Sequence, residues 1–240
     1  ENSSESDTYT DIFRTNKLDK LHGAATEVAS LANTFNGKVY SDDIATESNF
    51  KKRAPKSRIL HVATHGIVNH TQPEMSYLVF AEDGKTEDDG LLHLFEIYDI
   101  ALENDLTILS ACSTGDGDNI DGEGVMSMAR AFTYAGSKSV IMSLWLANDR
   151  TTSTVIEGFY ENLKAGKTKS QSLRDSKLSY LASANNLNAH PIYWAHLITT
   201  GNNEPIDPEN ADRSFWWLIL LLPVLLIVLA IKRRSQSRVV

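Results

Sequence analysis

Two residues of the sequence have side chains that could act together in nucleophilic catalysis, namely His65 and Cys112. Cys112 is the single cysteine of the 240-residue chain, so it cannot form an internal disulfide. A thiol becomes nucleophilic near neutral pH when a base lies beside it, and an imidazole is such a base. Taken alone, a cysteine in "SAC" is more often a small packed residue, so the interpretation depends on what brings the pair together.

Both residues follow an apolar segment that has the character of a buried strand. "RILHVATHG" places His65 directly after residues 59–63, and "DLTILSACSTG" places Cys112 directly after residues 105–111. Continuous apolar runs of this length are typical of parallel strands that are buried on both faces. Ligands bind at the carboxyl ends of parallel strands, so both side chains would face one crevice if the two strands are neighbours.

The rest of the pattern predicts an α/β domain in which a mainly parallel sheet lies between layers of helices. Further strands are expected at residues 38–40, 76–81, 139–145 and 195–201. Helices are expected at residues 18–37, 46–53, 124–135, 151–164 and 170–184. The first of these helices is expected to end at Gly37, because glycine commonly follows a helix C-terminus.

The order of the two residues favours one of two known cysteine-protease layouts. His65 precedes Cys112 by 47 residues, which is close to the roughly 50-residue interval of caspase-type proteases, whereas papain-like enzymes have the cysteine first. Residues 18–201 also resemble the CHAT domain, a caspase-like peptidase module related to separase and often found behind tetratricopeptide repeats. The motifs that carry this resemblance, in the expected order, are "LHGAATEV", "ILHVATHG", "DGLLHLFEI", "LTILSACSTGDG", "GEGVMSMARAFTYAGSKSVIMSLW" and "HPIYWAHLITTG".

The resemblance implies a three-layer α/β/α sandwich of caspase type, with His65 and Cys112 as the catalytic dyad. His65 would be the general base, and Cys112 would attack the scissile carbonyl of a protein or peptide substrate. Gly66 has no side chain, so its N–H could approach the developing oxyanion together with the N–H of Cys112. No cofactor is expected. The alternative is a catalytically silent scaffold that binds protein partners in a signalling or regulatory assembly, although both dyad positions hold competent residue types.

Two acidic residues are candidates for binding the substrate side chain before the scissile bond. Asp149 follows the expected strand at 139–145, and relatives in this group often use an acid there, so the resemblance implies a basic residue in the substrate. Asp149 could equally be the N-cap of the following helix, since Asp is a good capping residue. Glu123 would line the same pocket or start the helix at 124–135, where a carboxylate interacts favourably with the helix dipole.

Several other classes of site fit the sequence poorly. The loop "GDGDNIDGEG" has Ile120 where a calcium loop needs its third oxygen ligand, so no metal ion is expected. A phosphatase would need an arginine soon after the thiol, and a nucleotide-binding domain would need a "GxGxxG" or "GxxxxGK" after a strand. The net charge of -8 argues against nucleic acid. The histidines expected to have structural roles are His61, His70, His93, His190 and His196.

The C-terminal sequence predicts a membrane anchor. Residues 215–231 are 17 consecutive residues without a charge, and at roughly 1.5 Å per residue they span about 26 Å as a helix. The basic tail at 232–240 favours a cytoplasmic C-terminus, which puts the domain on the outer side, periplasmic or extracellular. This arrangement suits a bacterial inner membrane.

The remaining segments are expected to connect these parts. Residues 1–17 form a polar lead-in and residues 202–214 form a linker between the domain and the anchor. The chain begins without methionine, and CHAT domains often follow repeats. We therefore expect an upstream repeat domain of tetratricopeptide type.

Overall fold

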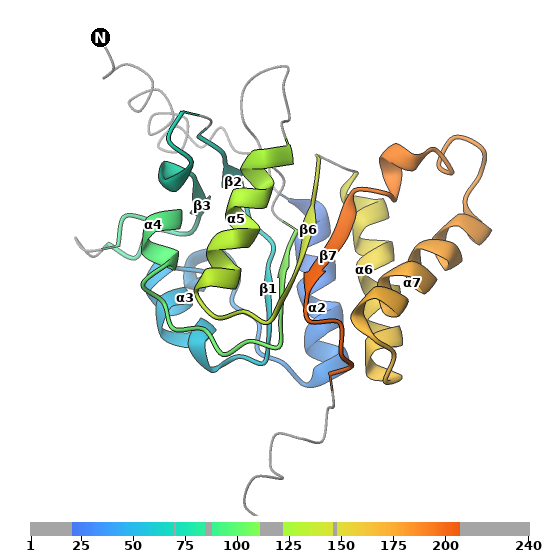
Figure 1. The fold of residues 1–240 in the computed structure, drawn as a ribbon, viewed down its shortest axis with the longest axis horizontal. Helices are drawn as coiled ribbons and strands as arrows, with labels where there is room; N and C mark the ends of the chain where they lie inside the picture. The colour runs from blue at the N-terminus through green and yellow to red at the C-terminus, as the bar shows by residue number, and fades with distance from the viewer. Residues whose placement is uncertain (1–20, 70, 85–87, 111–121, 146–147, 207–240) are drawn as a thin grey trace, which may run out of the picture. The chain divides into compact units, whose positions relative to one another are not determined.

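The computed structural model describes residues 21–69, 71–84, 88–110, 122–145 and 148–206 (Figure 1). The chain divides into two units, Glu1–Pro205 and Ile206–Val240, and the fold described below belongs to the first. The expected anchor at 215–231 lies outside the described residues. Within the described ranges, no helix is both long enough and apolar enough to cross a membrane.

A four-stranded sheet has the order β1-β5-β6-β7. Its strands are β1 (Ile59–Val62), β5 (Leu106–Leu109), β6 (Ser139–Ser143) and β7 (Leu197–Gly201). The first three strands are parallel, and β7 runs antiparallel to β6. The predicted mainly parallel sheet is therefore confirmed. Every residue of β5 and β6 is buried, which explains why these strands have continuous apolar sequences rather than alternating ones.

A second, three-stranded sheet follows β1 and was not predicted. It is antiparallel and consists of β2 (Gly66–Ile67), β3 (Tyr77–Val79) and β4 (Leu91–His93). The expected strand at 76–81 is present as β3. The expected strand at 38–40 is wrong, because no strand of the described residues pairs with this segment and its apolar side chains, Val39 and Tyr40, remain exposed.

Helices cover both faces of the four-stranded sheet (Figure 1). The helices of the described residues are α2 (His22–Phe35), α3 (Glu47–Arg53), α4 (Leu94–Ile97), α5 (Gly122–Tyr134), α6 (Asp149–Lys164) and α7 (Lys169–Ser183). Short 3-10 turns occur at Asp42–Ile44, Ala54–Lys56, Pro73–Met75 and Pro191–Tyr193. The α5 helix packs on one face of the sheet, and α2 and α6 pack on the other. This arrangement agrees with a caspase-like α/β fold.

Local sequence explains where the helices begin and end. Thr46 caps α3 by accepting a hydrogen bond from the Asn49 N–H at 3.2 Å. The α2 helix ends at Asn36 in the left-handed conformation, with φ at 53°, and not at the expected Gly37. Asparagine tolerates this conformation better than most residues. The N–H of Gly37 still donates to the Ala32 carbonyl at 2.9 Å.

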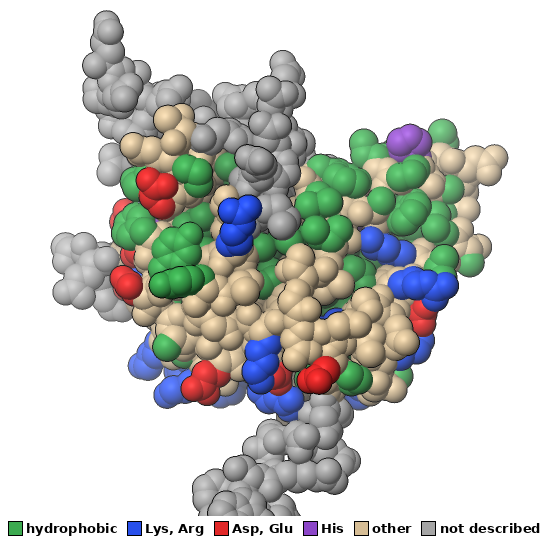
Figure 2. All heavy atoms as spheres, viewed as in Figure 1, with side chains coloured by type: hydrophobic (Ala, Val, Ile, Leu, Met, Phe, Trp, Pro, Cys, Tyr) green, Lys and Arg blue, Asp and Glu red, His purple; other side chains and the backbone are tan. Residues whose placement is uncertain are grey.

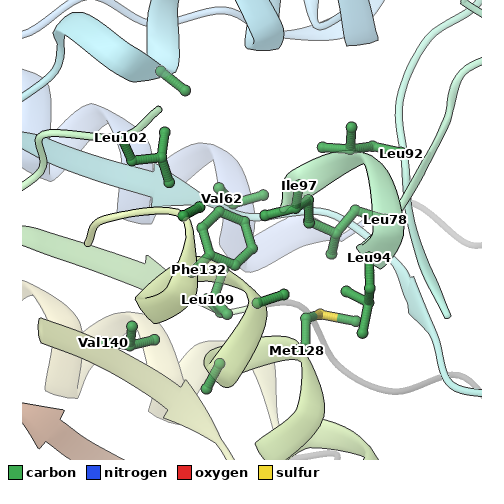
Figure 3. Packing of buried hydrophobic residues seen from close by; sticks show 14 of the residues in the cluster. Val62, Leu78, Leu92, Leu94, Ile97, Leu102, Leu109, Met128, Phe132 and Val140 are labelled. Atoms are coloured by element: carbon green, nitrogen blue, oxygen red, sulfur yellow. The ribbon is translucent and has the colours of Figure 1, made fainter. Parts of the chain in front are cut away.

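The core on the α5 side joins the two sheets (Figure 3). Val62 and Leu109 project from β1 and β5 toward Phe132 of α5, and Leu78 of the small sheet belongs to the same cluster. On the opposite face, Leu106, Ile108 and Ile141 are fully buried, as are Val155, Ile156 and Phe159 of α6. Successive side chains of a strand point to opposite faces, so the two helix layers bury alternate residues of the same strands.

Charged side chains surround this core without a clear separation by sign. On the face shown in Figure 2, acidic and basic groups lie intermixed along one rim. Arg58 and Lys138 both contact Asp105, at 2.7 Å in each case. Such mixed surfaces do not form the continuous basic stripe that follows a phosphate backbone.

Candidate active site

The register of the parallel sheet aligns the segments that carry the two candidate catalytic residues. Val62 of β1 lies opposite Leu109 of β5. His65 comes three residues after Val62, and Cys112 comes three residues after Leu109. The two segments therefore begin at paired positions of neighbouring strands, at the carboxyl edge of the sheet. Ligand sites of parallel sheets occur at this edge. Cys112 itself lies outside the described residues.

His65 lies in the short connection between the two sheets. Its carbonyl accepts a hydrogen bond from the Val79 N–H at 2.9 Å, and the Thr64 hydroxyl donates to the Val79 carbonyl. The Nδ1 atom of the His65 side chain is buried. The backbone of the expected general base is thus held by β3 on one side and by β1 on the other.

Gly66 begins β2 directly after His65. It lies opposite Leu78 of β3, one residue beyond the hydrogen bond between Val79 and His65. Bonded and non-bonded pairs alternate along an antiparallel ladder, so the pair of Gly66 and Leu78 is a non-hydrogen-bonded one. The Gly66 N–H consequently points away from β3.

The two acidic candidates lie in the first turns of helices that follow β5 and β6. Glu123 is the second residue of α5, and its side chain lies outside the described residues. Asp149 is the first residue of α6, and its carboxylate is 3.5 Å from the Gly23 N–H of α2. The N-cap interpretation of Asp149 is wrong by one residue, because the cap is Asn148, whose side chain accepts from the Arg150 and Thr151 N–H groups.

A group of polar side chains that the sequence did not predict lies beneath this edge of the sheet. We call it the buried polar cluster, and it consists of Glu27, His61, Ser110, Ser153 and Tyr160. His61 was expected only to pack, and its side chain is 1% exposed. Its Nε2 atom lies 3.1 Å from Glu27 Oε2 and 3.0 Å from Ser110 Oγ, and its Nδ1 atom lies 2.5 Å from the Tyr160 hydroxyl.

The cluster contains the residue types of a serine hydrolase triad but not its geometry. In such a triad the serine and the acid contact different nitrogens of the imidazole. Here Ser110 and Glu27 share Nε2 of His61, and the other nitrogen faces Tyr160. Ser110 is also buried, at 8% exposure. The cluster is therefore not a second nucleophilic centre.

Electrostatics keep the phenol of this cluster in its neutral form. Burial, together with the nearby Glu27 carboxylate, raises the pKa of Tyr160 well above its usual value. The phenol therefore stays protonated, and its hydroxyl is the hydrogen-bond partner of Nδ1 of His61. Nε2 of the same ring lies within hydrogen-bond distance of both Glu27 Oε2 and Ser110 Oγ. Ser153 lies 3.4 Å from the second oxygen of Glu27, so α2 and α6 both contribute to the arrangement.

The other histidines have local structural contacts where the structure describes them. His93 caps α4 in a reciprocal arrangement with Glu96, and His190 caps the turn at Pro191–Tyr193. His196 is fully buried. His70 lies outside the described residues. In the described part of the chain, no group of three or more histidine, cysteine or acidic side chains is arranged to hold a metal ion.

A mainly parallel sheet, with a histidine after one strand and a cysteine in the sequence after the neighbouring strand, is consistent with a caspase-like α/β protein. The family model of the CHAT domain matches residues 3–202, and the chain belongs to this family. The sequence is 26% identical over 121 residues to Tetratricopeptide repeat protein 28 of Mus musculus, which covers 50% of this chain and 5% of that protein. The protein of the same name from Homo sapiens is 26% identical over 137 residues, which covers 55% of this chain and 5% of the human protein.

Proposed function

We propose that the chain is a CHAT-type cysteine endopeptidase that uses His65 and Cys112 as its catalytic dyad. The observation that carries the proposal is the pairing of β1 with β5. Val62 and Leu109 are in register, and each candidate residue follows its strand at the same distance along the chain. Membership of a caspase-like family supports the same assignment.

The chemistry would proceed through a thioester. The His65 imidazole takes the proton of the Cys112 thiol, and the thiolate forms a C–S bond with the scissile carbonyl carbon. The oxyanion accepts hydrogen bonds from the N–H groups of Gly66 and Cys112. His65 then gives its proton to the amine as the C–N bond breaks, and water, deprotonated by the same imidazole, hydrolyses the thioester.

The acidic residues around the carboxyl edge suggest the substrate. Asp149 begins α6 and Glu123 lies in the first turn of α5, and both helices follow strands of the parallel sheet. We assign to these carboxylates the binding of a basic side chain before the scissile bond. The direction of the Gly66 N–H, away from β3, is compatible with its assigned role as an oxyanion donor.

The proposal also includes a membrane anchor and an upstream repeat domain. Residues 215–231 would anchor the protein in a membrane as a single pass, with the basic tail in the cytoplasm and the peptidase domain on the outer side. The relatives are named for tetratricopeptide repeats, which supports an upstream repeat domain as the regulatory partner.

The decisive experiment compares the wild type with Cys112→Ala and His65→Ala on a peptide library, with the upstream region included. Each substitution is expected to lower kcat/KM by at least about 100-fold. His190→Ala is the matched control, because it removes an exposed histidine and should retain cleavage. Equal cleavage by wild type and Cys112→Ala, or none by wild type under any activating condition, would favour the silent scaffold.

A further inference from the structure

The buried polar cluster joins β1 and β5 at the point where their backbone pairing ends. The N–H of Ser110 donates to the Val62 carbonyl at 3.1 Å, just beyond the last residue of β5. The contact of 3.0 Å between Ser110 Oγ and His61 Nε2 adds a side-chain connection at the same place. Cys112 follows two residues later in the sequence. Contacts that hold Ser110 in place therefore also determine where the segment that contains Cys112 begins, at the end of β5.

This contact is held from two further elements. Glu27 of α2 is 3% exposed and Tyr160 of α6 is fully buried, and each contacts a different nitrogen of His61. A buried donor or acceptor that loses its partner is costly, so the imidazole has one favourable position. The ring in turn presents Nε2 to Ser110. The position of the serine hydroxyl is thus determined by α2, β1 and α6 together.

Stability alone does not require a polar network at this place. The same face of the sheet also buries Ile108 and Ile141, which pack without polar partners for their side chains. Replacing a buried polar network by well-packed apolar residues is often neutral or stabilising. The contact between His61 and Ser110 lies toward the carboxyl end of the strands, beside the points where the segments with His65 and Cys112 begin.

We propose that His61 and Ser110 are positioning residues that hold the cysteine segment against the histidine segment. This inference rests on the proposed dyad. The imidazole of His61 contacts neither the substrate nor the thiol in this assignment. It acts through Ser110 and keeps the end of β5 at a fixed distance from β1, so that the thiol and the catalytic base meet.

The experiment measures the thiol directly and does not require peptidase activity. Cys112 is the single cysteine, so the rate at which iodoacetamide labels the folded full chain reports on that residue alone. Ser110→Ala removes the hydroxyl that contacts Nε2 of His61, and Tyr160→Phe removes the hydroxyl that contacts Nδ1 from a different element. Each variant is expected to slow labelling at pH 7 by about fivefold and to raise the pH midpoint of labelling, because less thiolate forms. Where peptide cleavage is measurable, kcat falls and KM stays unchanged.

Thr107→Val is the matched control. Thr107 lies on the same strand, and its hydroxyl is 2.8 Å from Ser137 Oγ in a buried contact at the other end of β5. The control should lose a similar amount of thermal stability and keep the labelling midpoint of the wild type. Wild-type labelling in both Ser110→Ala and Tyr160→Phe, or an equal shift in Thr107→Val, would overturn the inference. Failure of the dyad would be seen separately, as a labelling midpoint that His65→Ala leaves unchanged.

Discussion

His196 lies immediately before β7, and its Nε2–H donates a hydrogen bond to the hydroxyl of Thr152 on α6 at 3.1 Å. The direction follows because the Thr152 proton is given to the Asn148 carbonyl, also at 3.1 Å. The Nδ1 atom of His196 is buried and has no hydrogen-bond partner among the described residues. Burial, with a smaller contribution from the charge of Lys177, lowers the pKa of His196 from 6.5 to about 4.

This histidine should make the domain less stable in mild acid. Below about pH 6.5 the unfolded chain binds a proton that the folded chain accepts only near pH 4, so the free energy of unfolding falls by about 3 kcal/mol across this window. Urea denaturation at pH 7 and pH 4.5 measures the loss, and His196→Gln should reduce it. The exposed His190→Gln is the control. An equal reduction in that control would contradict burial as the cause.

Two glycines with positive φ should respond very differently to alanine. A Cβ at Gly136 would lie 2.1 Å from the Leu102 carbonyl oxygen, whereas a Cβ at Gly166 would meet nothing within 4 Å. Gly136→Ala is expected to cost more than about 4 kcal/mol of unfolding free energy, and Gly166→Ala only the left-handed backbone strain of about 1 kcal/mol. Chemical denaturation of both variants checks this. Similar losses would mean that the turn after α5 can shift.

Lys51 should stabilise the domain chiefly by compensating a buried carboxylate. Its Nζ atom lies 2.5 Å from Glu47, 3.0 Å from Asp88 and 2.9 Å from Glu96, and the Glu47 side chain is only 2% exposed. Lys51→Met would leave that carboxylate buried without a cation, at a cost of about 3 kcal/mol by urea denaturation. The exposed Lys52→Met should have little effect.

The loss in Lys51→Met should depend on pH. Burial already raises the pKa of Glu47 in the folded chain, and removal of the cation raises it further. A raised folded pKa favours the folded state at low pH, and this advantage is lost as the pH rises. The variant should therefore lie closer to wild type at pH 5 than at pH 8. The double variant Lys51→Met with Glu47→Gln should recover stability, and a deficit that stays constant with pH would contradict the charge argument.

Asp149→Asn tests the proposed preference for a basic residue in the substrate. It should lower kcat/KM roughly tenfold for peptides with lysine or arginine before the scissile bond, and leave neutral peptides unchanged. The Asn148 cap is untouched, so α6 should still form. Glu161→Gln, an exposed change on the same helix, is the control. An equal loss on basic and neutral peptides would assign Asp149 to the contact with Gly23 instead.

The parallel strands could be predicted because their signal is contained within single short segments. β1, β5 and β6 are apolar runs, and Thr46 marks the start of α3 as its cap. The small sheet could not be predicted in full, since strands of two or three residues contain too few positions to establish alternation. The segment 38–40 has the composition of a strand, but nothing in the sequence shows that it lacks a partner.

The residues of the candidate site also differ in whether the local sequence could predict them. His65 and Cys112 each have a local signal, namely a position directly after an apolar run. The buried polar cluster has none, because His61 is separated by 34 residues from Glu27 and by 99 residues from Tyr160. A histidine inside the apolar segment "ILHVA" was the only available sign that a polar partner must exist.

The long separation between His61 and Tyr160 also determines when this part of the molecule can be completed. A nascent chain that has emerged only as far as β5 contains Glu27, His61 and Ser110, but the phenol that satisfies Nδ1 of His61 is still to be synthesised. Contacts between residues so far apart in the sequence also require the entropic cost of closing a long loop. A fragment that stops before α6 would lack both this phenol and the helix that covers His61, so the edge of the sheet can be completed only in a chain that extends past Tyr160.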